Sequence, residues 1–111
     1  MTRIALAAAV AAAALVAALP AAAAIPTFKG TVGPGFTISM ASKPTKAGKI
    51  RLVIADKSNI HNFHLTGPGV NIKTSVPATG SKTFTLTLKK GTYRFVCDPH
   101  LTSMKGSFTV K

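Results

Sequence analysis

Acidic residues are almost missing from this sequence of 111 residues. Asp56 and Asp98 are its only carboxylate side chains, against 14 Lys and Arg residues, and the formal net charge is +12. Two isolated aspartates supply neither paired carboxylates nor a Ser/His/Asp set, so we do not expect an enzyme. The excess of positive charge favours acidic partners and speeds association with them. Because the basic residues are scattered and form no run, we expect a solvated basic surface and no binding to nucleic acid.

Long apolar runs are missing except at the start of the chain. A short basic start, residues 1–3, precedes an apolar run over residues 4–19 and the small residues 21–24. This order is typical of a secretory signal peptide, and we place the cleavage after Ala24. The run is short for a bilayer span, which needs roughly 20 residues. We therefore expect residues 1–24 to be removed and residues 25–111 to be exported to the periplasm or the extracellular space, with no stable membrane insertion.

Cysteine is represented once, by Cys97. In the oxidising compartments that exported proteins reach, cysteines usually pair. A lone cysteine there implies an intermolecular bridge, a reactive thiol or a bond to a metal ion.

Helical periodicity is also missing after the leader. Apolar and polar residues alternate instead, with Gly and Pro turns at short intervals, which is typical of short strands. The clear segments are 36–40, 50–54, 63–65, 84–88, 93–95 and 108–110, and weaker ones are 27–32 and 71–76. The sequence therefore predicts one all-β domain over residues 25–111, a monomeric Greek-key β-sandwich of about seven or eight strands.

The alternation also predicts which polar side chains face inward. Cys97 shares parity with the apolar residues of the strand that it ends, and His61 with those of the strand that it begins. Met104 shares parity with the apolar residues of the last strand, and His100 lies in the loop between Cys97 and Met104. His64 falls on the opposite face. The sequence thus gathers two imidazoles, a thiolate and a thioether at one end of the sandwich.

This set of side chains is typical of a blue-copper electron-transfer centre, in which two His and one Cys form a near-trigonal plane with a weak axial Met. Soft sulfur favours Cu(I), and imidazole suits both oxidation states. Zinc also accepts Cys and His ligands, but Met104 favours copper. We therefore predict one copper ion held by His61, Cys97, His100 and, more weakly, Met104.

The same residues resemble the cupredoxins, especially plastocyanins, pseudoazurins and amicyanins. The likeness lies in the motifs His61-Asn62-Phe63-His64, Gly91-Thr92-Tyr93-Arg94-Phe95-Val96-Cys97, and Cys97-Asp98-Pro99-His100 with Met104. The resemblance implies that His61 is the first ligand, that Asn62 braces the ligand loop near the cysteine sulfur, and that His64 is not a ligand. The spacing departs from the family, since three residues separate His100 from Met104 where plastocyanins usually have four and amicyanins two.

Two functions remain open. The first is a one-electron carrier between redox proteins with acidic docking surfaces, using His100 near an exposed apolar end as the electron port. The second is a protein for copper storage, delivery or resistance. A Met-rich or His-rich tail would favour delivery, but only Met40 and Met104 follow the leader, so electron transfer is our first hypothesis.

Overall fold

Eight strands and one turn of 3-10 helix make up residues 24–111, the part of the chain that the structure, a computed structural model, describes. The predicted signal peptide lies, apart from Ala24, outside these residues. Across residues 24–111, no helix has the length and apolar character needed to cross a bilayer. The elements are β1 Thr27–Val32, β2 Ile38–Met40, β3 Gly48–Asp56, β4 His64–Gly67, β5 Val70–Lys73, β6 Gly80–Leu88, β7 Gly91–Val96, η1 Asp98–His100 and β8 Lys105–Val110.

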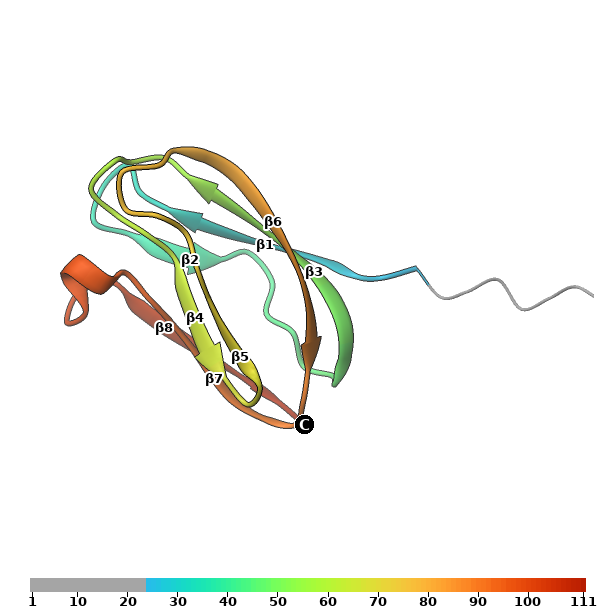
Figure 1. Cartoon of the computed structure of the whole chain (residues 1–111). Coiled ribbons are helices and arrows are strands. Elements are labelled where there is room, and N and C mark those ends of the chain that lie inside the picture. Colours follow the sequence, from blue (N-terminus) through green and yellow to red (C-terminus); the bar gives the residue numbers. More distant parts are fainter. Residues whose placement is uncertain (1–23) are drawn as a thin grey trace, which may run out of the picture.

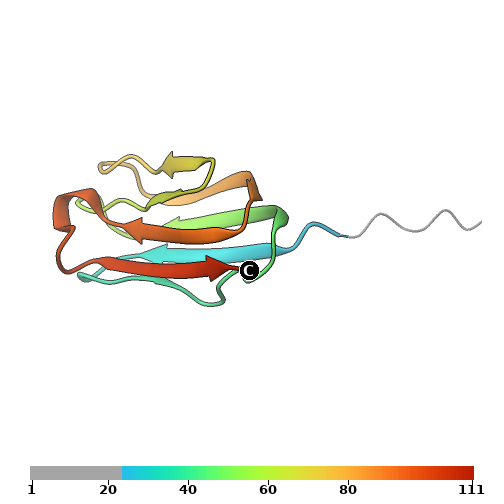
Figure 2. The same cartoon turned by 90° about the horizontal axis from the view of Figure 1, so that it is seen from below.

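The strands form two four-stranded sheets that pack face to face (Figure 1). One sheet has the order β2-β1-β3-β6, and the other has the order β5-β4-β7-β8. Within these sheets β1 and β3 run parallel and the other paired strands are antiparallel. The chain crosses between the sheets after β3, β5 and β6, as expected for a Greek-key sandwich. The predicted all-β sandwich is therefore confirmed. Figure 2 shows that η1 lies at the end of the sandwich opposite the C-terminus.

The core lies between the two sheets and follows the predicted alternation. In β3 the buried apolar side chains are Ile50, Leu52 and Ile54, with more exposed residues between them. Across the interior, the rings of Phe63 and Phe95 stack at 5.4 Å between centroids. Such aromatic pairs add to the free energy gained by burying apolar area. Because Phe95 lies two residues before Cys97, the ring stack lies close to the start of the ligand loop.

A glycine of β8 makes room for this aromatic layer. Gly106 pairs with Phe95 across the β7–β8 ladder, and a Cβ at that position would collide with the Phe95 ring. Only glycine lets the ring lie flat against the neighbouring strand.

Several predicted strand boundaries differ from the structure; β6, for example, begins at Gly80 rather than at residue 84. Strand β4 begins at His64 rather than His61, because the Phe63 N–H donates to the Thr74 side-chain oxygen (2.9 Å) instead of to a neighbouring strand. Strand β2 covers only Ile38–Met40, and Phe36 is 62% exposed at the surface. Strand β5 ends at Lys73, before the end of the predicted segment 71–76.

Candidate metal centre

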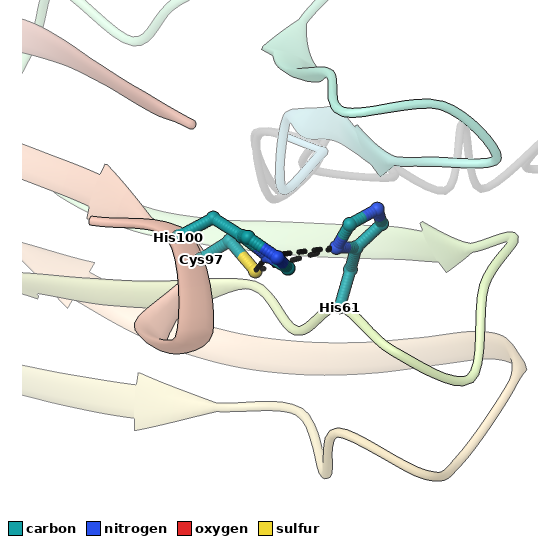
Figure 3. A group of neighbouring side chains, drawn as sticks. All are labelled: His61, Cys97 and His100. Atoms are coloured by element: carbon teal, nitrogen blue, oxygen red, sulfur yellow. Dashed lines mark hydrogen bonds between the residues drawn. The ribbon is translucent and has the colours of Figure 1, made fainter. Parts of the chain in front are cut away.

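Two loops at one end of the sandwich bring the predicted site residues together. His61 lies in the segment between β3 and β4, whereas Cys97 and His100 come from the turn that follows β7 (Figure 3). Cys97, His61 and Met104 are buried, and His100 is partly exposed. Figure 3 shows that both imidazoles and the thiol point toward one another.

Three side-chain atoms form a small triangle. The two Nδ1 atoms of His61 and His100 lie 3.2 Å apart, and the Sγ of Cys97 lies 3.7 Å from the first and 3.5 Å from the second. A point equally distant from all three lies roughly 2 Å from each, close to the lengths of about 2.0 Å to nitrogen and about 2.3 Å to sulfur that a first-row metal ion keeps. The triangle therefore has the size that one such ion requires.

The turn after Cys97 holds the third corner of the triangle and places Met104 beside it. The His100 N–H donates to the Cys97 carbonyl (2.9 Å), the Met104 N–H donates to the His100 carbonyl (2.9 Å), and the Cys97 N–H donates to the Met104 carbonyl (3.0 Å). The sequence did not predict the 3-10 turn η1, which forms because Pro99 has a φ that suits a helical turn and lacks an N–H. These three hydrogen bonds close the turn and bring Met104 back beside Cys97, just before β8 begins.

The donor set of this cluster fits copper. Two imidazoles and a cysteine sulfur converge, and Met104 bonds to Cys97 through its backbone. Two His, one Cys and one Met form the set that is typical of a type 1 copper site. Within the described residues, the three converging atoms have no hydrogen-bond partners other than one another. Such a cluster of His and Cys atoms, all within 4.8 Å of one another, suits a metal ion better than it suits a hydrogen-bonded core.

Asn62 fastens the ligand loop to the segment that follows β5. Its side-chain oxygen accepts the Asp98 N–H (2.8 Å), and its amide nitrogen donates to the Asp98 carboxylate (2.8 Å) and to the Thr74 carbonyl (3.3 Å). Asn62 is 2% exposed, so these bonds are sheltered from water. The structure thus places Asn62 against the residue that follows Cys97, where the resemblance expected a brace.

His64 lies outside the triangle and takes part in a second polar cluster. Its Nδ1 lies 2.8 Å from the Asp98 carboxylate, and its Nε2 lies 2.7 Å from the Asn71 side-chain oxygen. Desolvation lowers the pKa of His64, but the two hydrogen bonds and the Asp98 charge outweigh it, and the pKa is raised overall. Burial raises the pKa of Asp98, and the bonds from His64 and Asn62 with the nearby positive charges bring it below its ordinary value.

Exposed apolar side chains surround the histidine that reaches the surface. The ring of Phe36 packs edge-on against both His61 (5.1 Å between centroids) and His100 (5.0 Å). Ile60 precedes His61 and Leu101 follows His100, and both are exposed. We call Phe36, Ile60 and Leu101 the apolar rim. The sequence predicted an apolar end but missed the role of Phe36, because the Gly-Pro-Gly turn before it does not reveal where the ring points.

Known proteins share this architecture. The family model described as Cupredoxin-like domain matches residues 5–110. Reduced rusticyanin has a similar fold, with a TM-score of 0.60, 22% identity, and coverage of 77% of this chain and 78% of that chain. Auracyanin A, a "blue" copper protein from the green thermophilic photosynthetic bacterium Chloroflexus aurantiacus, has a TM-score of 0.55, 18% identity, and coverage of 79% and 100%.

A further fold match comes from a heme-copper terminal oxidase dimer, with a TM-score of 0.53, 15% identity, and coverage of 77% of this chain and 63% of that chain. At these identities the likeness concerns the fold. No curated protein matches the chain by sequence.

Proposed function

The chain belongs to the family of cupredoxin-like domains, and we propose that within this family it is a one-electron carrier with a single type 1 copper ion. The observation that carries the proposal is the triangle of His61 Nδ1, His100 Nδ1 and Cys97 Sγ, with edges of 3.2 to 3.7 Å, in which one corner reaches the surface. Met104 is the fourth, weaker ligand in this proposal. Bound copper would supply the Cu(I)/Cu(II) couple.

The protein supplies rigidity and a route to the surface. His61 and Cys97 are fully buried and Met104 nearly so, which keeps water away from three of the four ligands. The ligand loop is closed by its own backbone hydrogen bonds and tied down by Asn62. A site that changes little in shape between two oxidation states needs little reorganisation when an electron is transferred, because the ligands do not have to move.

His100 is the proposed electron port. It is the one partly exposed member of the triangle, and the apolar rim surrounds it. A small apolar surface of this kind allows brief contact with a partner without strong binding. The net charge of +12 favours redox partners with acidic docking surfaces, and the association rate should fall as ionic strength rises.

Three further properties belong to the proposal. The leader-like sequence over residues 1–24 supports an exported protein, periplasmic or extracellular. In this proposal the mature protein works as a monomer. N-terminal sequencing of the secreted protein should begin at residue 25. The two aspartates supply no catalytic carboxylate pair, which supports a carrier rather than an enzyme.

The test is the visible spectrum of the mature protein, residues 25–111, after addition of Cu(II). A thiolate–copper centre should give an intense band near roughly 600 nm that ascorbate bleaches and air restores. In Met104→Ala the band should persist with a changed potential, because the thioether is the weak ligand. A wild-type protein that binds no copper, or binds it without this band, would refute the proposal.

Copper storage, delivery or resistance is the competing function, and it predicts different kinetics. A carrier should exchange electrons with a soluble redox partner much faster than it loses Cu(I) to a competing chelator. A delivery protein should show the reverse order, with rapid release of Cu(I). Measuring both rates on the same sample separates the two.

A further inference from the structure

Both ring nitrogens of His64 face hydrogen-bond acceptors. Nδ1 lies 2.8 Å from an oxygen of the Asp98 carboxylate, and Nε2 lies 2.7 Å from the side-chain oxygen of Asn71. An ionised carboxylate and an amide oxygen only accept hydrogen bonds, whereas a neutral imidazole has one donor and one acceptor. With the Asn71 oxygen facing Nε2, as it does in the structure, both contacts are satisfied together only when the ring carries two protons, which is the imidazolium form.

The partner of His64 is bonded directly into the ligand loop. Asp98 follows Cys97 in the chain, and its second carboxylate oxygen accepts a hydrogen bond from Asn62. A continuous chain of contacts therefore runs from Asn71 through His64 and Asp98 to Asn62. We call these four residues the paired flank of the metal centre.

The charged groups near His64 lie on three elements: the ligand loop, β5 and β7. Asp98 faces it from the ligand loop, and Lys73 lies opposite it in the β4–β5 ladder. On the other side, Val96 of β7 pairs with His64 and carries no charge, but Arg94 of the same strand lines the surface hollow that His64 and Asp98 share. Hydrogen bonds and the Asp98 charge raise the pKa of His64 despite its desolvation and despite Lys73.

We propose that His64 is a positioning residue that stays in the imidazolium form, neutralises Asp98 and thereby holds the reduction potential of the copper site above the value that an unpaired Asp98 would impose. The inference rests on the proposed copper function. An unpaired carboxylate next to Cys97 would stabilise the more positive Cu(II) state by Coulomb attraction. A hydrogen-bonded cation beside that carboxylate cancels most of this effect.

The experiment is a double-mutant cycle read out as the reduction potential of the copper-loaded protein. His64→Gln removes the positive charge, and we expect a more negative potential, seen as a several-fold lower Cu(I)/Cu(II) ratio at a fixed solution potential. Asp98→Asn removes the negative charge and should move the ratio in the opposite direction. In the double variant the two shifts should largely cancel, because each charge acts mainly through the other.

Lys105→Gln is the matched control. Lys105 is exposed on β8 directly after Met104, so the variant also removes one positive charge close to the site, yet Lys105 is not in contact with Asp98 in the structure. We expect a smaller shift than in His64→Gln. Equal shifts in the two variants, or an unchanged potential in His64→Gln, would overturn the proposal.

A measurement on the unmodified protein keeps the inference testable if a variant fails to fold. In the diamagnetic Cu(I) form, nitrogen NMR at neutral pH should show both nitrogens of His64 protonated, and a neutral ring would overturn the proposal. The same spectrum can be recorded without copper. A protein that binds no copper but keeps a protonated His64 would refute the copper function and leave the ion pair intact, so the two failures are distinguishable.

Discussion

The two sides of the metal centre differ in how completely their polar groups are paired. On the paired flank, the side chains of Asn62, Asp98 and His64 bond to one another. A second group, which we call the unpaired flank, consists of His61 and Asp56, where the Nε2 of His61 and one carboxylate oxygen of Asp56 are buried without a partner among residues 24–111. Asp56 ends β3, and His61 lies in the segment that joins β3 to β4.

The difference shows two ways of holding a ligand. His61 is held by packing, because Phe36 covers its ring and a Cβ at Gly33 would lie 3.4 Å from His61 Cδ2. The ligand loop has no such enclosure, since Asp98 and His100 are partly exposed, and it is held by hydrogen bonds instead. Buried polar groups without partners lower stability, whereas fully paired networks make a structure more rigid. We therefore expect substitutions on the two flanks to change stability in opposite directions.

The largest expected effect comes from Cys97→Ser, because Cys97 contributes to two edges of the triangle between the flanks. Wild-type protein should be stabilised by copper, by about 2.7 kcal/mol at a copper concentration about 100 times Kd. The variant should lose the band near roughly 600 nm, and copper should no longer raise its melting temperature. Thermal unfolding of both proteins with and without copper measures this stabilisation. Equal stabilisation of both proteins would mean that copper binds elsewhere.

The second-largest effect is expected from a substitution that breaks the hydrogen bonds of the paired flank. Asn62→Ala removes three hydrogen bonds and leaves the Asp98 N–H and the Thr74 carbonyl without their side-chain partner. We expect the copper-free protein to lose roughly 2 kcal/mol, or about 8–16 °C in melting temperature for a domain of this size. Asn59→Ala is the control, since Asn59 is exposed, and it should melt like wild type. Equal melting of the two variants would show that the flank is not stabilising.

The third prediction concerns the unpaired flank, where we expect a substitution to raise the stability of the protein instead of lowering it. Burial raises the pKa of Asp56, and the Ser58 N–H and the charge of His61 oppose this only partly. The native state therefore loses stability as pH rises above the ordinary value of about 4 through the raised pKa, because the buried carboxyl must ionise. Asp56→Asn can keep the bond from Ser58 and avoids the charge, so it should raise the stability of the copper-free protein at pH 7 by roughly 1 kcal/mol.

Melting curves of wild type and Asp56→Asn at two pH values separate this charge effect from a packing effect. Near pH 3.5 the wild-type carboxyl is largely protonated, and the two proteins should melt at similar temperatures. A variant that is less stable than wild type at pH 7 would mean that Asp56 is stabilised by a partner beyond Ser58.

The two flanks also show which features of the site could be predicted from the sequence. Alternation with a period of two correctly predicted a sandwich, because strand geometry assigns alternate residues to opposite faces. It also predicted buried side chains for His61, Cys97 and Met104, and these are buried although none of the three lies within a strand. It also placed His64 outside the cluster of ligand atoms. All of these inferences depend only on local pattern and on the spacing of the loop.

The paired flank could not be predicted in this way. The contact between His64 and Asn71 depends on the register of β4 with β5, and the contact with Asp98 depends on the turn η1. Both join residues that local alternation treats as independent. The shortage of acids was the available signal, since one of only two carboxylates directly follows the lone cysteine and needs a partner when the loop folds.

The smallest expected effect is the pH dependence that the His64–Asp98 pair adds to stability. The raised pKa of His64 means that its contribution is complete below the ordinary value of about 6.5 and is lost as pH rises through the raised value. The lowered pKa of Asp98 means that its contribution is present above about 4 and is lost as pH falls through the lowered value. The pair should therefore stabilise the copper-free protein most at roughly pH 5 to 6. Because the side chains are 20% and 39% exposed, solvent screening limits the gain to about 0.5–1 kcal/mol.

The difference in melting temperature between wild type and His64→Gln, followed across this range, measures the contribution. It should be largest between the two pKa values and should shrink on both sides of them. A difference that does not change with pH would assign the role of His64 to its hydrogen bonds alone, and the two flanks would then differ in packing and pairing but not in charge.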